Sequence, residues 1–140
     1  MVAGVVYDVI KDELFWAEKG QGAFLNDKRL RVAARTHLQD GLLVTGRFGD
    51  LPALERVLAV TPLVRRYGAA ALDLAYVAAG RFDGFWERDL KPWDIAAGAL
   101  LVREAGGYAR EIDGKDFMDT GAILATNNAL FAPLQKLIKR

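Results

Sequence analysis

The sequence predicts an α/β fold in which an incomplete antiparallel sheet joins a mixed sheet flanked by helices. Residues 1–40 consist of short β-rich runs separated by turn residues, without a helical pattern. Residues 41–140 alternate strand-like with helix-like segments, which is typical of an α/β layer. This change of style predicts two parts: a strand meander over 1–40 and a C-terminal α/β unit over 41–140.

The first part is expected to form a meander. Its predicted strands are residues 4–10 (GVVYDVI), 14–20 (LFWAEKG), 23–26 (AFLN) and 29–33 (RLRVA). The charged residues 11–13 form the first turn, and Asp27–Lys28 is a plausible hairpin connection. These strands are strongly apolar, yet the chain has no early helix to cover them. We therefore expect the remnant of a larger sheet whose beginning is absent, with an exposed edge, an exposed apolar face and self-association, for example as a homodimer.

The second part supplies the alternating elements. Its predicted strands are residues 42–48, 82–87, 108–112 and 122–126. Its predicted helices are residues 51–60, 69–80, 93–105 and 130–138. Gly80 and the pair Gly106–Gly107 are stop signals for two of the helices. The run 95–102 carries no charge, so we expect the helix around it to be buried between layers.

Composition excludes several classes of protein. The chain has 140 residues, 52% hydrophobic and 26% charged, and a net charge of +1, so it is globular and nucleic-acid binding is unlikely. It has no cysteine and a single histidine, His37, which excludes thiolate and multi-histidine metal sites and favours an oxygen-ligated ion such as Mg²⁺. No apolar run is long enough for a membrane span and no signal peptide is visible. A cytoplasmic protein is expected.

Polar groups gather where predicted elements begin or end. Glu87 ends a strand, Asp94 opens the apolar helix, and Gly68, Ala69 and Ala70 open another helix. The N–H groups at a helix start suit a phosphate, and a carboxylate beside them suits a hard cation. The alternatives are structural: Asp94 is a favourable partner of the helix dipole, Glu87 is a solvated strand end, and residues 68–70 are a close-packed helix start.

Several motifs in order resemble the inositol monophosphatase family. The string LKPWDIAAGALLVREAGG (90–107) is similar to its W-D-x-A-A-G motif with an E-A-G-G ending. The block 65–87 is similar to the preceding G-S/T-A-A motif with V-A-x-G, and residues 4–8 and 12–26 match the family as well. The resemblance covers nearly the whole chain.

The resemblance implies magnesium-dependent hydrolysis of phosphate monoesters, in which Mg²⁺ polarises the phosphate and activates a water molecule. Asp94 would be a metal ligand that also contacts the substrate, and Glu87 would bind a substrate hydroxyl. Gly68, Ala69 and Ala70 would line the substrate site through their backbone N–H groups.

The chain also departs from the family's pattern. It lacks the family's glutamate motif and its D-P-x-D-G-T motif, which together hold most of the metal ions and the attacking water, and Ala69 replaces the usual serine or threonine. Arg47–Phe48 replaces a common G-F-P sequence, and Val9 follows Asp8 where the family often has proline. We therefore expect a C-terminal fragment that is inactive or weakly active alone. The alternative is a non-catalytic dimerisation or regulatory module, since some bacterial relatives are thought to bind the transcription machinery.

Other polar and aromatic residues have structural interpretations. Asp73 lies within an apolar helix and is expected to satisfy a local hydrogen bond. Trp16, Trp86 and Trp93 are expected in the core, and His37 on the surface.

Overall fold

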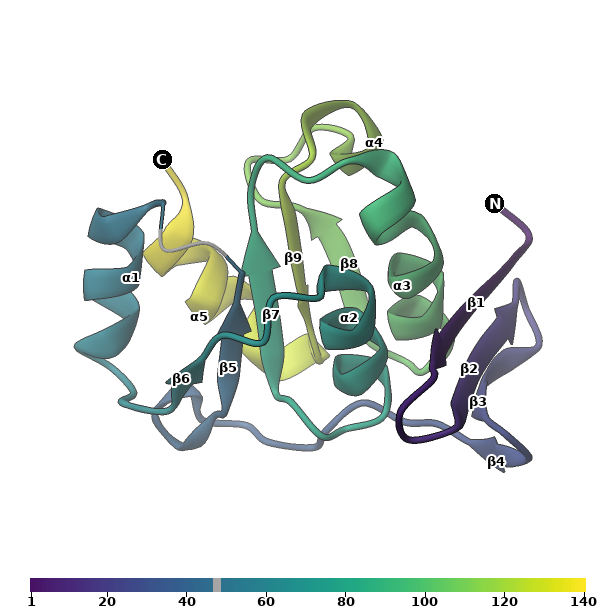
Figure 1. Cartoon of the computed structure of the whole chain (residues 1–140). Coiled ribbons are helices and arrows are strands. Elements are labelled where there is room, and N and C mark those ends of the chain that lie inside the picture. Colours follow the sequence, from purple (N-terminus) through teal and green to yellow (C-terminus); the bar gives the residue numbers. More distant parts are fainter. Residues whose placement is uncertain (47–48) are drawn as a thin grey trace.

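The computed structural model describes residues 1–46 and 49–140. It has the predicted α/β class, with two sheets and a layer of helices between them (Figure 1). Two residues of the predicted strand 42–48, Arg47 and Phe48, lie outside the described residues. None of the helices in the described part of the chain is long and apolar enough to cross a membrane.

The first sheet is a purely antiparallel meander in the order β1-β2-β3-β4. Its strands are β1 (Ala3–Asp8), β2 (Glu13–Glu18), β3 (Gly22–Leu25) and β4 (Lys28–Arg29). The last strand begins one residue before the predicted 29–33, because the hairpin turns at Asn26–Asp27, and it ends already at Arg29, beyond which the Val32 N–H donates to the Ala105 carbonyl oxygen at 3.1 Å. Asn26 adopts a left-handed φ of 50°, which asparagine tolerates well, and this tight turn brings Lys28 into the ladder opposite Leu25.

The second sheet is mixed, as predicted, in the order β6-β5-β7-β9-β8. Its strands are β5 (Leu43–Thr45), β6 (Val64–Arg65), β7 (Gly84–Glu87), β8 (Tyr108–Glu111) and β9 (Ile123–Thr126). Strand β5 runs parallel to β6 and β7, whereas β9 runs antiparallel to β7 and β8. The two-residue strand β6 was not predicted because it carries no alternating pattern of its own.

Five α-helices and one short 3₁₀ helix complete the described fold. They are η1 (Leu38–Asp40), α1 (Leu51–Leu58), α2 (Ala70–Ala78), α3 (Pro92–Glu104), α4 (Phe117–Thr120) and α5 (Asn128–Ile138). Helix α5 begins two residues before its predicted start because Asn127 caps it, accepting a bond from the Leu130 N–H at 2.9 Å.

Two apolar cores lie on opposite faces of the second sheet, as the period-two alternation of its strands requires. Val44 and Phe85 belong to the core shared with α2, α3 and the first sheet, whereas Leu43 and Trp86 belong to the core under α1 and α5. The first core spans both predicted parts of the chain, and the division near residue 40 stays a prediction.

Helix α3 is buried between the layers, as predicted from its charge-free run. Gly98 allows α2 to approach closely, since a Cβ there would lie 2.5 Å from the Leu74 Cβ. The prediction for Trp93 was wrong: its side chain is 78% exposed, because the first turn of α3 extends past the layers that bury the rest. Trp86 is in the core, and Trp16 is half-buried and stacks on Phe24. His37 is exposed, as predicted.

The outward face of the first sheet is apolar, as expected. Val5 is 59% exposed, Tyr7 48% and Leu14 38%, and they alternate with buried neighbours such as Val6 and Phe15. Figure 1 shows no helix on this side of the sheet.

Candidate functional site

The residues singled out from the sequence line one cavity of about 450 Å³. It opens at the carboxyl ends of the parallel strands β5 and β7, where α/β layers commonly bind ligands. Its lining residues are Gly46, Arg66, Gly68, Ala69, Ala70, Ala71, Leu72, Glu87, Leu90 and Asp94. Sequence reasoning missed the other five of these residues, which are Gly46, Arg66, Ala71, Leu72 and Leu90. The glycine, alanine and leucine residues lack reactive groups, and Arg66 lies just after the two-residue strand β6, next to another arginine.

Glu87 is placed by the end of β7 and is buried, with 8% of its surface exposed. The alternative of a solvated strand end is therefore wrong. Its carboxylate occupies the space that a side chain at position 46 would need, so any residue other than Gly46 must displace the carboxylate. The Arg66 Nε donates a hydrogen bond to the carbonyl oxygen of this same Gly46. Glycine at position 46 thus permits the buried carboxylate, and Arg66 places a positive charge at the cavity wall.

Asp94 lies in the first turn of α3 and is half-buried. Its Oδ2 accepts a hydrogen bond from the Lys91 backbone N–H at 2.9 Å, which satisfies one donor at the helix start. One carboxylate oxygen thus stabilises the helix terminus, which fixes the rotamer of the side chain. The cap and a ligand role are therefore compatible, because a cap of this kind uses only one of the two oxygens.

The N-terminus of α2 contributes backbone donors to the cavity. Gly68 has a φ of +79°, a conformation that favours glycine, and a Cβ there would meet nothing within 4 Å. The expectation of close packing is therefore wrong for Gly68, whose glycine is required by backbone conformation. Ala69 is the N-cap residue and makes no side-chain capping bond, so the first N–H groups of α2 lack a capping side chain.

The loop between β7 and α3 connects Glu87 to Asp94. It is anchored by a contact with Gly121, which does not line the cavity. The Leu90 N–H donates to the Gly121 carbonyl oxygen at 3.0 Å, and a Cβ on Gly121 would overlap the Leu90 carbonyl oxygen. Gly121 also has a φ of +70°. Gly121, which lies 27 positions after Asp94 in the sequence, therefore fixes the conformation of the loop that places Leu90 at the cavity wall.

Asp73 lies on α2 behind the cavity and contradicts its predicted role. It is 1% exposed, and neither of its carboxylate oxygens has a hydrogen-bond partner within the described residues. Burial raises its pKa to about 7, and the negative charge of Glu87 adds to the rise. The expected local hydrogen bond is absent because the Asp73 side chain is packed among buried residues that offer its two oxygens no donor.

The described residues do not form a magnesium site by themselves. Within residues 1–46 and 49–140, no three histidine, cysteine, aspartate or glutamate side chains lie close enough together to hold a metal ion. Asp94 offers one carboxylate, whereas Mg²⁺ typically binds one or two carboxylates together with phosphate oxygens and waters.

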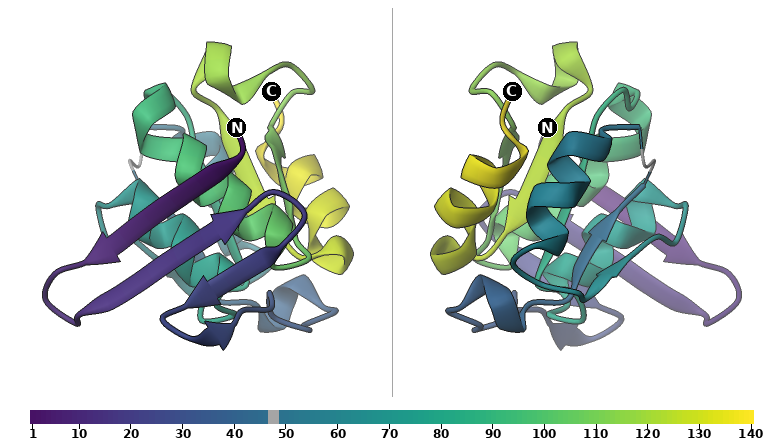
Figure 2. Two further views of the ribbon diagram at one scale, coloured as in Figure 1. Left: turned by 90° about the vertical axis from the view of Figure 1, so that its right-hand side faces the viewer. Right: turned by 90° about the vertical axis from the view of Figure 1, so that its left-hand side faces the viewer.

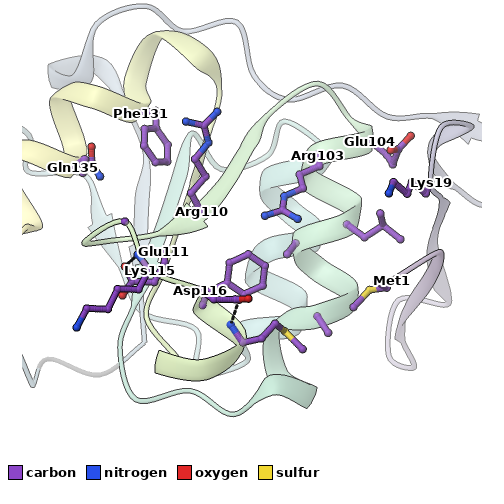
Figure 3. Close-up of a pocket in the computed structure, with 16 residues that line it drawn as sticks. Met1, Lys19, Arg103, Glu104, Arg110, Glu111, Lys115, Asp116, Phe131 and Gln135 are labelled. Carbon is purple, nitrogen blue, oxygen red and sulfur yellow. Dashed lines mark hydrogen bonds between the residues drawn. The ribbon is translucent and has the colours of Figure 1, made fainter.

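A second, larger cavity of about 880 Å³ lies between α3, β8 and the loop before α4 (Figure 3). Its charged residues serve the fold: the Arg103 Nη2 donates to the Ala109 carbonyl oxygen at 2.8 Å, and Glu111 accepts from the Lys115 N–H at 2.9 Å. Arg110 lies over the ring of Tyr108 at 4.4 Å. None of the predicted site residues lines this cavity.

The family model "Inositol monophosphatase family" matches residues 1–139. The chain belongs to the inositol monophosphatase family. An inositol-1-monophosphatase of Mesorhizobium japonicum is 50% identical over an alignment of 149 residues that covers 100% of this chain and 56% of that protein. A Nus factor SuhB of Pseudomonas aeruginosa is 46% identical, over 96% of this chain and 54% of its own length.

Solved structures of the family confirm the fold. The extragenic suppressor protein suhB of Bartonella henselae is 51% identical with a TM-score of 0.94, covering 99% of this chain and 59% of that one. The inositol monophosphatase of Anabaena is 41% identical with a TM-score of 0.90, covering 97% of this chain and 57% of that one. The chain therefore spans little more than half the length of these family members.

Proposed function

We propose that this chain carries the substrate-binding part of a magnesium-dependent phosphate monoester hydrolase. One observation carries the proposal: Glu87, Asp94 and the start of α2 line the same cavity in a member of the inositol monophosphatase family. The two acids come from different elements, so their meeting at one edge of the sheet is a product of the fold.

Each residue has a role that its position supports. Asp94, with one oxygen committed to the Lys91 N–H, would give the other to Mg²⁺ and to the substrate's alcohol part. Glu87, buried at the cavity wall, would accept a hydrogen bond from a substrate hydroxyl. The N–H groups and the positive dipole end of α2, after Gly68, Ala69 and Ala70, would attract the phosphate.

Two-metal hydrolysis needs a cluster of ligands around the ions, and within the described residues no such cluster surrounds Asp94, so we infer that further ligands come from polypeptide outside this sequence. We therefore expect the isolated chain to release little or no phosphate from inositol 1-phosphate. Magnesium-dependent release from the purified chain would contradict this expectation.

A chimera tests the proposed function directly. The matched region of the Mesorhizobium japonicum inositol-1-monophosphatase is replaced by this chain, and Mg²⁺-dependent phosphate release is measured. We expect activity in the chimera, at least a hundredfold lower kcat/KM in D94N and a higher KM in E87Q. D119N, an exposed acid on α4 that does not line the cavity, is the matched control. A folded chimera without activity, or an unimpaired D94N variant, would overturn the proposal.

A second candidate is a non-catalytic regulatory or dimerisation module. The observation that favours it is the 46% identity to a protein named as a Nus factor. We expect a chimera with that Pseudomonas aeruginosa protein to bind that protein's partners even when it carries both E87Q and D94N. Loss of this binding in the double variant would show that partner binding depends on the cavity, and would contradict a regulatory module that acts independently of it.

A further inference from the structure

Arg88 follows Glu87 directly in the sequence, and its side chain lies on the other face of the second sheet. Side chains alternate along β7: Glu87 lines the cavity, whereas Trp86 belongs to the core under α1 and α5. Arg88 continues this alternation, because its guanidinium reaches the start of α1 and the end of α5. The right view of Figure 2 looks onto that side of the molecule, where these two helices lie in front of the sheet.

The guanidinium of Arg88 is held by three separate elements. Its Nη1 donates to the Asp113 Oδ2 at 2.8 Å, just after β8, and its Nη2 donates to the Ile138 carbonyl oxygen at 3.2 Å, at the end of α5. Its Nε lies 3.7 Å from the Oδ2 of Asp50, the N-cap residue of α1. The side chain is only 14% exposed, so these charged contacts are screened less than contacts at an open surface.

The two acids that hold Arg88 are themselves fixed by the fold. Asp50 uses its other oxygen, Oδ1, to accept a bond from the Ala53 N–H at 3.2 Å as the cap of α1. Asp113 is held through its backbone N–H, which donates to the Glu111 Oε2 at 2.7 Å. The hydrogen bond from Arg88 keeps the pKa of Asp113 below its usual range, so this carboxylate is ionised at neutral pH.

The backbone around Arg88 is the place where strand β7 ends. The ladder with β9 extends to Glu87, whereas the described ladder with β5 ends one residue earlier, where Trp86 lies opposite Thr45. Directly after Arg88 the chain turns at Asp89, which has a left-handed φ of 62°. Arg88 is therefore placed to fix the end of the strand that carries Glu87.

We propose that Arg88 is a positioning residue for Glu87. Its guanidinium, anchored to α1, α5 and the end of β8, fixes the end of β7 so that the Glu87 carboxylate keeps its place at the cavity wall. Arg88 does not line the cavity, so it acts through Glu87 and does not contact the substrate. This inference rests on the proposed function, in which Glu87 accepts a hydrogen bond from a substrate hydroxyl.

A double-mutant cycle in the chimera described above tests this role. R88M removes the three contacts and should raise KM for inositol 1-phosphate at least fivefold, with kcat within threefold of the wild type. In the E87Q background the same change should alter KM less than twofold, because the carboxylate that Arg88 positions is gone. A purely structural role would instead lower kcat as well, and its effect would add to that of E87Q.

R140M is the matched control. Arg140 also contacts Asp50, with its Nε 3.3 Å from the Oδ2, but its side chain is 65% exposed and touches neither β7 nor the cavity. Both kinetic parameters should stay within twofold of the wild type in this variant. R88K keeps the charge but only one donor group, so its KM should lie between those of the wild type and R88M.

Hydrogen exchange in the isolated chain gives a readout that needs no catalysis. The Leu90 N–H lies two residues after Arg88 and donates to the Gly121 carbonyl oxygen. In R88M its exchange should speed up at least tenfold, while the amides of α2 stay within twofold, which excludes a general loss of stability.

Three outcomes would overturn the proposal: an unchanged KM in R88M, full additivity of R88M with E87Q, or a wild-type exchange rate at Leu90 in R88M. A wild-type chimera without activity would instead overturn the proposed function. The exchange rates would then still decide whether Arg88 fixes the end of β7, so the two failures are distinguishable.

Discussion

Asp73 is the residue whose surroundings most directly predict a measurable property. Its raised pKa, about 7, means that the folded state favours the neutral acid. This contribution to stability is present below the unfolded pKa of 3.8 and is lost as pH rises through about 7. D73N should therefore be more stable than the wild type above pH 7, by up to about 4 kcal/mol, with the difference shrinking toward pH 4. Urea unfolding from pH 4 to 8 measures the effect.

The control for that experiment is D119N, whose side chain is exposed on α4. Its stability should follow the wild type at every pH. Parallel curves for D73N and the wild type would show that Asp73 is ionised in the folded chain.

Gly46 makes a second prediction at the scale of a residue. In G46A the new methyl group would overlap the Glu87 carboxylate and must displace it from the cavity wall. In the active chimera described above, KM should rise at least tenfold because the substrate hydroxyl loses its acceptor, while G49A, at an open position, should have no effect. An unchanged KM in G46A would remove Glu87 from substrate binding.

At the scale of an element, the N-terminus of α2 lacks a side-chain cap, whereas the N-terminus of α3, the other helix start at the cavity, has one. Ala69 occupies the N-cap position, and its methyl side chain has no atom that could accept a bond from the backbone N–H groups of the first turn. A69T should stabilise the chain by about 1 kcal/mol and raise Tm by roughly 2–5 °C. The isosteric A69V lacks the hydroxyl and should give no such gain in a thermal unfolding experiment. Equal effects of the two variants would assign the change to the side-chain volume.

Elements with strong periodicity could be predicted from the sequence, and those set by tertiary contacts could not. The charge-free run of α3 predicted its burial, and Glu87 and Asp94 could be placed together because both lie at ends of elements. Local patterns could not show that Gly46 makes room for Glu87, or that Gly121 holds Leu90, because each pair is distant in sequence. The prediction for Asp73 was wrong for the same reason. Whether a buried carboxylate finds a hydrogen-bond donor depends on how distant residues pack around it.

At the scale of the whole molecule, the uncovered face of the first sheet governs behaviour in solution. Val5, Tyr7 and Leu14 expose apolar surface on one side of a four-stranded sheet. We expect the 15.4 kDa chain to self-associate through these faces, with an average mass that rises with concentration in light scattering. V5T combined with L14T should shift this association to at least severalfold higher concentration, since both changes leave β1 and β2 paired. A wild-type chain that stays monomeric at high concentration would contradict the expectation.

The contact between Leu90 and Gly121 couples the cavity to a distant part of the chain. Any ligand that draws the β7–α3 loop inward must lengthen or break the bond from the Leu90 N–H to the Gly121 carbonyl, now 3.0 Å. The amide signal of Leu90, a residue that lines the cavity, should therefore report such a displacement of the loop when a ligand binds.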